Sequence, residues 1–407
     1  MSTIVLAYSG GLDTSVLLKR HILDGNDVIA MTLDLGESDP TAGTGAAAAL
    51  DAVREKALKL GAKAALLVDA KERFIDEMAL PALRANALYE GMYPMSAALS
   101  RPLIAALLVE TAHEYGADAV SHGCTGKGND QVRIEIAVKA LDPKLTVLAP
   151  LRERPMSRPD AIDFAKANGV PVPHTVDQPY SVDANLWGRS IEAGVLEDPW
   201  AAPPEDAYAW TAAPGKRPAE PEEFIVEFES GVPSATRMSG PQLLAEMNRQ
   251  AGKHGIGRID LVEDRIVGVK SREVYECPGS IALITAHKAL ERLILTRDEI
   301  RFKSLLDQKW TELTYDGLWP SPLRKAIDAF NAAIAPRMTG RVRLRFHQGN
   351  CVVEGTQSPF GLYDERLATY GRDDAFKHDA AGGFIHLWGL PIELNARVEH
   401  EALTLAK

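Results

Sequence analysis

The chain has 407 residues, 46% of them hydrophobic and 25% charged, which is typical of a soluble globular protein with two or three domains. Its 45 basic and 56 acidic residues give a net charge of −11, which argues against a large basic surface for nucleic acid. The three cysteines, Cys124, Cys277 and Cys351, include no CxxC pair, so we expect neither disulfides nor a structural zinc site.

The N-terminus enters a strand pattern at once, without a basic and apolar leader. No apolar run along the chain approaches the roughly 20 residues that a membrane span needs. We therefore expect a cytoplasmic protein that contacts no membrane.

Residues 1–170 alternate between strand and helix signals. Gly25 and Gly61 stand where helices would end, and Pro102 suits the first turn of a helix that continues to Gly116. Repeated strand–helix units predict a doubly wound α/β domain around a parallel sheet. The predicted strands are short apolar runs rich in β-branched residues, at 3–8, 28–35, 64–69, 117–122 and 145–150.

The second half of the chain has a different texture, and we predict a separate α+β domain over 171–380. It opens with the extended stretch PVPHTVDQPYS (171–181), and six prolines from Pro199 to Pro221 predict a long surface excursion. The later signals are a half-buried strand at 222–231, helical stretches at 241–251 and 281–314, a hairpin at 341–355 that turns at Gln348-Gly349-Asn350, and a strand-then-helix segment at 381–407.

The stretch AYSGGLDTS (7–15) joins the first predicted strand to the first predicted helix. Its two glycines allow backbone N–H groups to approach an anion, the helix N-terminus adds a positive dipole, and three hydroxyl side chains add donors. The alternative is an ordinary turn capped by Asp13, Thr14 or Ser15. A cap alone needs neither two glycines nor three hydroxyl groups, so we favour a phosphate site.

The loop contains neither GxxxxGK[ST] nor GxGxxG, so it has no Walker lysine and no dinucleotide fingerprint. SGGLDTS (9–15) instead resembles the pyrophosphate-binding loop of the N-type ATP pyrophosphatases, which cleave ATP between the α- and β-phosphates. The resemblance implies a nucleotide-binding domain over 1–170 in which this loop receives the departing pyrophosphate.

A second glycine-rich loop, SHGCTGKGNDQVR (121–133), follows another predicted strand, so we expect both loops at the same edge of the sheet. Asn129 and Asp130 can cap the helix that follows, and Arg133 lies one turn further on. This set suits a zwitterionic substrate, with its carboxylate on Arg133 and its amino group on Asp130. The alternative is a capped surface helix with a solvated ion pair.

Taken together, the two loops and four further stretches resemble the argininosuccinate synthase family nearly from end to end. The further stretches are ALYEGMYP (87–94), SVDANLWGRS (181–190), GKHGIGRIDLVEDRIVGVKSREVYECPG (252–279) and SPFGLYDE (358–365). The chain lacks the N-terminal cysteine glutaminase, the amidotransferase domain, the catalytic cysteine pairs and the basic RNA surface that related ATP pyrophosphatases would carry.

The resemblance implies a ligase that condenses citrulline with aspartate to argininosuccinate. A citrullyl-adenylate would form first, and AMP and pyrophosphate would be released, with Mg²⁺ bridging the phosphates. The substrates would be small molecules, with no nucleic-acid partner. The resemblance also implies a homotetramer, in which the C-terminal helix could dock on a neighbouring subunit.

The same resemblance assigns residues to the substrates. Asp13, Asp130 and Arg133 would carry the reaction: Asp130 would hold the aspartate ammonium group, and Asp13 would act through Mg²⁺ or only cap the helix. No set of side chains is expected to hold a metal ion by itself. ATP would contact Ala7, Tyr8, Ser9, Gly10, Gly11, Leu12, Asp13, Thr14, Ser15, Leu33 and Gly123; aspartate would contact Thr125, Asn129 and Asp130; citrulline would contact Tyr93, Asn129, Arg133, Ser181, Ser190, Glu263 and Tyr275.

Some of these residues also have simpler interpretations. Glu263 could face solvent from a strand, and Tyr93 and Tyr275 could be packing residues.

The chain also departs from the family at Ser96-Ala97-Ala98, where many members have Gly-Thr-Ser. Ala98 thus replaces a serine expected on a substrate carboxylate, and Ser96 or Ser100 could substitute for it.

Two rival functions remain open on the sequence alone. One is another ATP pyrophosphatase with a different amine or acceptor. The other is a nucleotide sensor that binds ATP without turnover, although that hypothesis leaves the second domain unexplained.

Overall fold

The computed structural model describes residues 2–36, 45–171 and 180–405. The chain divides into two compact units, residues 1–360 and residues 361–407. The stretch 172–179 of the predicted extended segment lies outside the described residues. Every helix in the described part of the chain is too short or too polar to cross a membrane.

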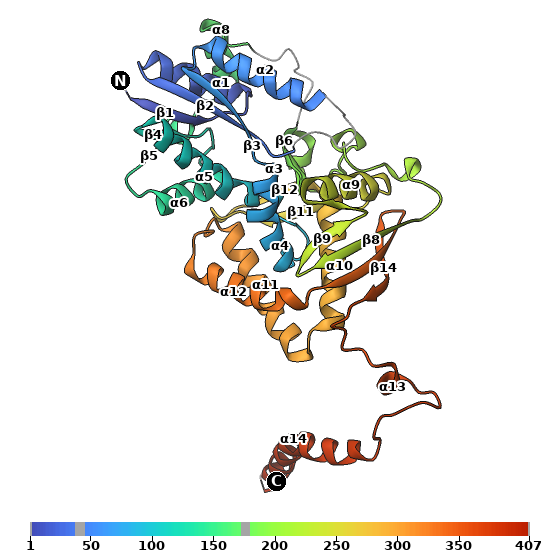
Figure 1. The fold of residues 1–407 in the computed structure, drawn as a ribbon. Helices are drawn as coiled ribbons and strands as arrows, with labels where there is room; N and C mark the ends of the chain where they lie inside the picture. The colour runs from blue at the N-terminus through green and yellow to red at the C-terminus, as the bar shows by residue number, and fades with distance from the viewer. Residues whose placement is uncertain (1, 37–44, 172–179, 406–407) are drawn as a thin grey trace. The chain divides into compact units, whose positions relative to one another are not determined.

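A five-stranded parallel sheet forms the first part of the chain, as predicted (Figure 1). Val5 and Ile29 point into one core, whereas their neighbours Leu6 and Ala30 point into the other, so the central strands are buried on both faces. The strand order is β3-β2-β1-β4-β5, and the strands are β1 (Thr3–Ala7), β2 (Asp27–Asp34), β3 (Ala64–Asp69), β4 (Ala119–Ser121) and β5 (Thr146–Leu148).

Helices cover both faces of this sheet, which confirms the doubly wound α/β prediction. One face packs against α1 (Leu12–Leu23) and α2 (Gly45–Leu60), with α8 (Arg158–Ala167) beside α1. The opposite face packs against α5 (Ser96–Tyr115), which contacts α6 (Asp130–Leu141). Four short helices complete this part: α3 (Lys71–Phe74), the π-helix η1 (Ile75–Ala79), α4 (Leu80–Arg84) and α7 (Pro150–Glu153).

The strand order places a switch point beside β1. The chain moves from β1 to β2 and β3 on one side, and then returns to β4 and β5 on the other side. Loops that leave β1 and β4 therefore diverge at the carboxyl edge and open a crevice, which is where open α/β sheets bind ligands.

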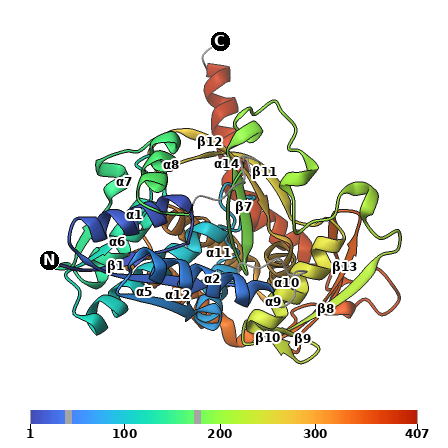
Figure 2. The same ribbon diagram turned by 90° about the horizontal axis from the view of Figure 1, so that it is seen from above.

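The second half of the first unit contains two antiparallel sheets, in agreement with the predicted α+β domain. One of these two antiparallel sheets has five strands, and it lies with its helices at the end of this unit away from β1 (Figure 2). The four-stranded sheet has the order β11-β12-β7-β6 and contacts α5, and the five-stranded sheet has the order β10-β9-β8-β13-β14. Their strands are β6 (Ser181–Asn185), β7 (Gly188–Glu192), β8 (Glu222–Glu229), β9 (Val232–Ala235), β10 (Met238–Ser239), β11 (Arg258–Asp264), β12 (Lys270–Glu276), β13 (Gly340–His347) and β14 (Asn350–Gln357).

The remaining helices pack around these sheets, and α10 lies against β13 and β14. The predicted hairpin is β13–β14, which turns at Gln348 and Gly349, both with positive φ. The helical elements are α9 (Gly240–Lys253), α10 (Pro278–Ile294), α11 (Arg297–Tyr315) and α12 (Pro322–Ile334), with the 3₁₀ turns η2 (Gly194–Glu197), η3 (Glu205–Ala207), η4 (Pro214–Lys216) and η5 (Ala335–Arg337), and, in residues 361–407, α13 (Glu365–Ala368) and α14 (Ala380–Leu405).

Three predicted elements were wrong in detail. Helix α5 begins at Ser96, so Pro102 lies inside it and not in its first turn. The predicted helical stretch 281–314 is two helices, because the Thr296 side chain and Glu299 form a capping box that starts α11. The predicted strand in 381–407 is absent, and α14 covers Ala380–Leu405 as one helix.

The proline-rich excursion at 199–221 is also anchored more firmly than predicted, by the fully buried carboxylate of Glu276 at the end of β12. This carboxylate accepts hydrogen bonds from the backbone N–H groups of Ala209, Trp210 and Thr211 at 2.8–3.0 Å. It also pairs with the Arg189 guanidinium at 2.7 Å. A buried charge needs such partners, so one side chain ties the excursion to the four-stranded sheet.

We predict that Glu276→Ala lowers the free energy of unfolding by about 3–5 kcal/mol, because it leaves the Arg189 charge buried and three backbone donors unpaired. Urea denaturation followed by tryptophan fluorescence measures this loss. The control is Glu227→Ala on the exposed face of β8, which should change stability by less than about 0.5 kcal/mol. Similar losses in the two variants would contradict the anchoring role.

Candidate active site

The phosphate loop, residues 9–15, leaves β1 at the switch point. Its helix α1 is capped by Gly11 in an extended conformation, and no side chain makes a capping hydrogen bond. The alternative in which Asp13, Thr14 or Ser15 caps the turn is therefore wrong. The N–H groups of the first helical turn stay available for an anion.

The hydroxyl groups of the loop are held by one another. The Ser9 and Thr14 hydroxyl oxygens are 3.1 Å apart, and the buried Tyr8 hydroxyl lies 3.1 Å from that of Ser15. Gly10 has φ +76°, and a Cβ atom there would lie 2.8 Å from the methyl groups of Val53 on α2. Only glycine fits at this position, which explains the first glycine of the motif.

The two glycine-rich loops meet, as the sequence predicted. A Cβ atom on Gly123, in the loop after β4, would lie 3.3 Å from Thr14 Cγ2 and 3.5 Å from Leu17. Leu33, the other residue expected near ATP, is buried near the carboxyl end of β2. The residues expected to contact ATP thus gather at the carboxyl edge of β1, β2 and β4.

A polar cavity of about 160 Å³ is lined by every residue that was expected to contact an amino-acid substrate. These residues come from the segment just before α5, the second loop with the first turn of α6, and strands β6, β7, β11 and β12. They are Tyr93, Thr125, Asn129, Asp130, Arg133, Ser181, Ser190, Glu263 and Tyr275. The sequence resemblance and the geometry therefore select the same place.

An ion-pair cluster lies at one side of the cavity. The Asp130 carboxylate pairs with Arg101 at 2.7 Å and with Arg133 at 3.1 Å. Burial alone would raise the pKa of the Asp130 carboxyl group, but the two guanidinium groups lower it to about 2. Asp130 is thus a permanent anion. The alternative of a surface helix with a solvated ion pair is wrong, because the Arg133 side chain is only 5% exposed.

Arg133 has unused hydrogen-bonding capacity. Its Nε donates to the Tyr315 carbonyl oxygen at 2.9 Å and its Nη1 donates to Asp130. Its buried Nη2 has no partner within the described residues. A buried unpaired guanidinium nitrogen beside a cavity is suited to bind a carboxylate.

Glu263 faces the cavity and not solvent. Its carboxylate accepts hydrogen bonds from the hydroxyl groups of Tyr275, at 2.6 Å, and of Tyr315. Burial raises the pKa of the Glu263 carboxyl group. Tyr275 in turn stacks on Tyr93, with ring centroids 3.7 Å apart. These tyrosines are both packing residues and cavity walls.

The Asn129 side chain holds the second loop against Tyr315 and Ile266. Its side-chain N–H donates to the Tyr315 hydroxyl at 3.0 Å, and its carbonyl oxygen accepts from the Ile266 backbone N–H at 2.9 Å. Asn129 occupies the capping position of α6, yet its side chain makes no capping hydrogen bond. The predicted capping role is therefore wrong, since the side chain is used in contacts with β11–β12 and α11.

Sequence reasoning missed several residues of the cavity. Arg101 lies on α5 and pairs with Asp130 and with Asp183, and Arg265 bridges two carboxylates across the sheet. Their contacts join positions far apart in the chain, and no local pattern marks them. The missed residues that line the cavity are Ala97, Arg101, Gly128, Asp183, Glu192, Arg265, Glu273 and Tyr315.

Neither serine replaces the one expected at Ala98 as a cavity residue. Ala98 is fully buried in the core. The Ser96 hydroxyl lies 3.1 Å from that of Tyr93, and Ser100 accepts a hydrogen bond from Arg101 at 2.7 Å. Ser96 and Ser100 are buried outside the cavity wall, whereas Arg101 reaches into it.

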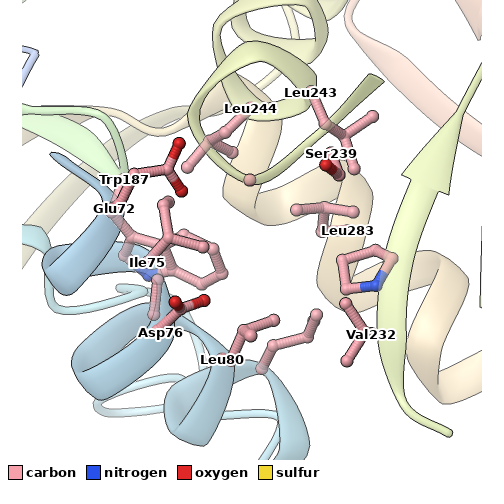
Figure 3. Close-up of a pocket in the computed structure, with 14 residues that line it drawn as sticks. Glu72, Ile75, Asp76, Leu80, Trp187, Val232, Ser239, Leu243, Leu244 and Leu283 are labelled. Carbon is pink, nitrogen blue, oxygen red and sulfur yellow. The ribbon is translucent and has the colours of Figure 1, made fainter. Parts of the chain in front are cut away.

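A second cavity, of about 140 Å³, lies elsewhere in the first unit (Figure 3). Leu243, Leu244 and Val232 give it an apolar wall, and the carboxylates of Glu72 and Asp76 lie at its other side. It contains none of the residues expected to bind a substrate. Across residues 2–36, 45–171 and 180–405, no group of three or more His, Cys, Asp or Glu side chains could hold a metal ion.

Comparisons with known proteins agree over the length of the chain. Residues 3–171 match the family model described as the arginosuccinate synthase N-terminal HUP domain, and residues 180–395 match that of the C-terminal domain. An argininosuccinate synthase of Geobacillus kaustophilus is 54% identical over 401 residues, covering 98% of this chain and 97% of the relative. One of Bacillus pumilus is 53% identical over 398 residues, covering 97% and 96%.

The cavity also contains a carboxyl group with a strongly shifted pKa, that of Glu273. Burial and the neighbouring Glu192 carboxylate raise this pKa to about 8, although Arg265 opposes the shift. The folded state therefore keeps this proton at pH values where the unfolded chain, with its ordinary value of 4.5, has lost it. Stability from this group is present at low pH and is lost as the pH rises.

We predict that the wild type loses stability relative to Glu273→Gln as the pH rises from about 4.5 to about 8, because glutamine cannot ionise. Denaturation midpoints measured across this range give the difference. Glu227→Gln, on the exposed face of β8, provides a control whose difference from the wild type should stay flat. A Glu273→Gln difference that does not change with pH would contradict the assignment.

Proposed function

This chain belongs to the argininosuccinate synthase family, a family of ligases that join citrulline to aspartate while ATP is cleaved to AMP and pyrophosphate, and we propose how its residues share this reaction. The observation that carries the proposal is the single polar cavity beside the phosphate loop. Nine residues assigned to the two amino acids lie around it, from segments as far apart as Tyr93 and Tyr275.

In the proposed arrangement, ATP lies along the carboxyl edge of β1, β2 and β4, with its β- and γ-phosphates in the phosphate loop. The positive end of α1 and the loop hydroxyl groups then stabilise the negative charge that develops on the departing pyrophosphate. Gly123 packs on Thr14, so in this arrangement the second loop lies between the ATP site and the polar cavity.

Citrulline and aspartate occupy the polar cavity by exchanging ion pairs with it. We assign the citrulline carboxylate to Arg133, whose Nη2 has no partner in the described part of the chain, and the aspartate ammonium group to Asp130. Arg101, now paired with Asp130 and Asp183, is released to a substrate carboxylate when the ammonium group arrives. The aspartate ammonium group thus replaces Arg101 as a partner of Asp130, and the citrulline carboxylate takes the unused donor position on Arg133.

The chemistry then follows in two steps. The ureido oxygen of citrulline attacks the α-phosphorus, and the bond to the α–β bridging oxygen breaks, so that pyrophosphate leaves with the electron pair. The aspartate amino group next attacks the activated ureido carbon, loses a proton and expels AMP. A carboxylate with a pKa of about 2 is a poor base, so Asp130 acts by positioning the amine and not by removing its proton.

Magnesium fits this site only as a partner of ATP. Asp13, exposed in the first turn of α1, is the one carboxylate in the phosphate loop, and protein sites that bind Mg²⁺ with nucleotides often use one or two carboxylates plus phosphate oxygens. When bound there, Mg²⁺ would neutralise phosphate charge. Asp13 would hold it, in keeping with the absence of a capping role for this side chain.

We also propose a cytoplasmic homotetramer built from three segments, 1–170, 171–380 and 381–407. The support for the oligomer is α14, which is rich in apolar side chains and has no buried residue. A helix with many apolar residues gains stability only when they are covered, which makes another subunit its expected partner.

The reaction itself is tested by incubating the protein with ATP, citrulline and aspartate and measuring AMP and pyrophosphate. Formation of both, dependent on both amino acids, supports the proposal. ADP and phosphate as products would exclude cleavage at the α–β bond, AMP with a different amine or acceptor would indicate another ATP pyrophosphatase, and ATP binding without turnover would indicate a nucleotide sensor.

We predict that Arg133→Ala raises the KM for citrulline by about 30-fold or more and leaves that for ATP nearly unchanged, because it removes a buried charge-assisted contact to the carboxylate. Arg133→Lys keeps the charge but loses the planar fork, so its KM for citrulline should be intermediate. Steady-state kinetics with each substrate varied separately gives these constants. An equal rise for citrulline and ATP would overturn the assignment of Arg133.

For the oligomer, we predict that Leu387→Glu with Leu394→Glu, two apolar positions seven residues apart on one side of α14, yields smaller species than the wild type in sedimentation velocity. Charged side chains in an apolar contact cost several kcal/mol. The control Glu401→Gln should sediment like the wild type. An unchanged oligomer in the double variant would exclude this face of α14 as the contact.

A further inference from the structure

We propose that Lys56, on helix α2, is the cation of the phosphate loop: it fixes the Gly10–Gly11 peptide and contributes the positive charge that the loop itself lacks. This inference rests on the proposed function, because it takes residues 9–15 to be the seat of pyrophosphate. It adds a residue that lies 41 positions beyond the motif, on a separate helix.

The contact is direct. Lys56 Nζ donates a hydrogen bond to the Gly10 carbonyl oxygen at 2.8 Å. Val53, one turn earlier on the same face of α2, touches the position where Gly10 would carry a Cβ atom. One turn of α2 therefore holds Gly10 from two sides, by packing and by a charged hydrogen bond.

The contact also orients the loop. In a trans peptide the carbonyl oxygen and the next N–H group point in opposite directions. With the Gly10 oxygen turned toward Lys56, the Gly11 N–H turns away from α2, where it makes only a long contact of 3.4 Å with the Ser9 hydroxyl. This N–H is thus free to donate to a phosphate oxygen.

Charge is the second contribution. Residues 9–15 include Asp13 but no Lys or Arg, although they are proposed to receive a polyanion. Among the described residues, Lys56 is the only cationic side chain hydrogen-bonded to this loop, and it has no carboxylate partner. Burial lowers the pKa of its ammonium group, in keeping with a charge that lacks compensation within the described residues. A phosphate anion would provide it.

In P-loop enzymes the corresponding charge belongs to a lysine inside the glycine motif. Here the motif has Asp13 instead, and the lysine comes from the helix that follows the second strand of the sheet. Because Lys56 contacts the loop through the Gly10 carbonyl oxygen, we assign it an effect on pyrophosphate through the loop and no contact with the α-phosphorus. Lys56 is accordingly a positioning residue and not a catalytic one.

The test is Lys56→Met, which keeps the length of the side chain and removes its charge. We expect the KM for ATP and the inhibition constant for added pyrophosphate to rise about 10-fold or more, while the KM values for citrulline and aspartate stay within about twofold. Lys56→Arg should restore most of the affinity. The matched control is Lys59→Met, an exposed lysine on the same helix, which should behave like the wild type.

Two further measurements separate the possible failures. If Lys56→Met raises all KM values together, or lowers the unfolding midpoint without changing pyrophosphate inhibition, its role is only structural and the inference is overturned. Ser9→Ala probes the loop itself: if this variant weakens pyrophosphate binding and Lys56→Met does not, Lys56 has no role. If neither variant affects ATP or pyrophosphate, the loop is not the pyrophosphate seat, and the placement of ATP fails as well.

Discussion

The polar cavity depends on one hydroxyl group, that of Tyr315 at the end of α11. It accepts a hydrogen bond from Asn129, 186 residues earlier in the chain, and donates one to Glu263. The Tyr315 carbonyl oxygen also receives Arg133, and Gly317 approaches Arg133 so closely that a Cβ atom would lie 3.0 Å from its Cα. Because a buried carboxylate such as Glu263 must be paired, this set of contacts holds α6, α11 and β11 in register around the site.

The requirement that buried charges be paired also applies to the other charged side chains of the cavity. Its arginines pair with carboxylates: Arg101 with Asp130 and Asp183, and Arg265 with Glu192 and Glu273. The two proposed substrates also carry charged groups, carboxylates and ammonium groups. Binding can therefore exchange one set of ion pairs for another, and the desolvation cost is met in part before the substrates arrive.

Much of the fold and part of the site could be predicted because the signals are local. The five parallel strands are short runs rich in apolar and β-branched residues, and SGGLDTS resembles a pyrophosphate-binding loop within seven residues. Tyr315, Arg101 and Arg265 could not be found, since their partners lie on other elements and no spacing in the chain marks them. The break between α10 and α11 was readable, because Thr296 and Glu299 have the capping-box spacing. In 381–407 a strand was predicted before the helix, but Phe384 and Trp388 stack at helical spacing.

The distribution of the two sites along the chain has a consequence for synthesis. The phosphate loop needs β1, α1, α2 and β4, all of which lie within the first 121 residues, whereas the polar cavity is incomplete until Tyr315 has been made. Chains emerge from the ribosome N-terminus first, and domains generally fold as units. The proposed seat for ATP would thus be synthesised roughly 200 residues before the proposed acceptor site is complete, so a truncated product that folds could bind nucleotide but could not complete the reaction.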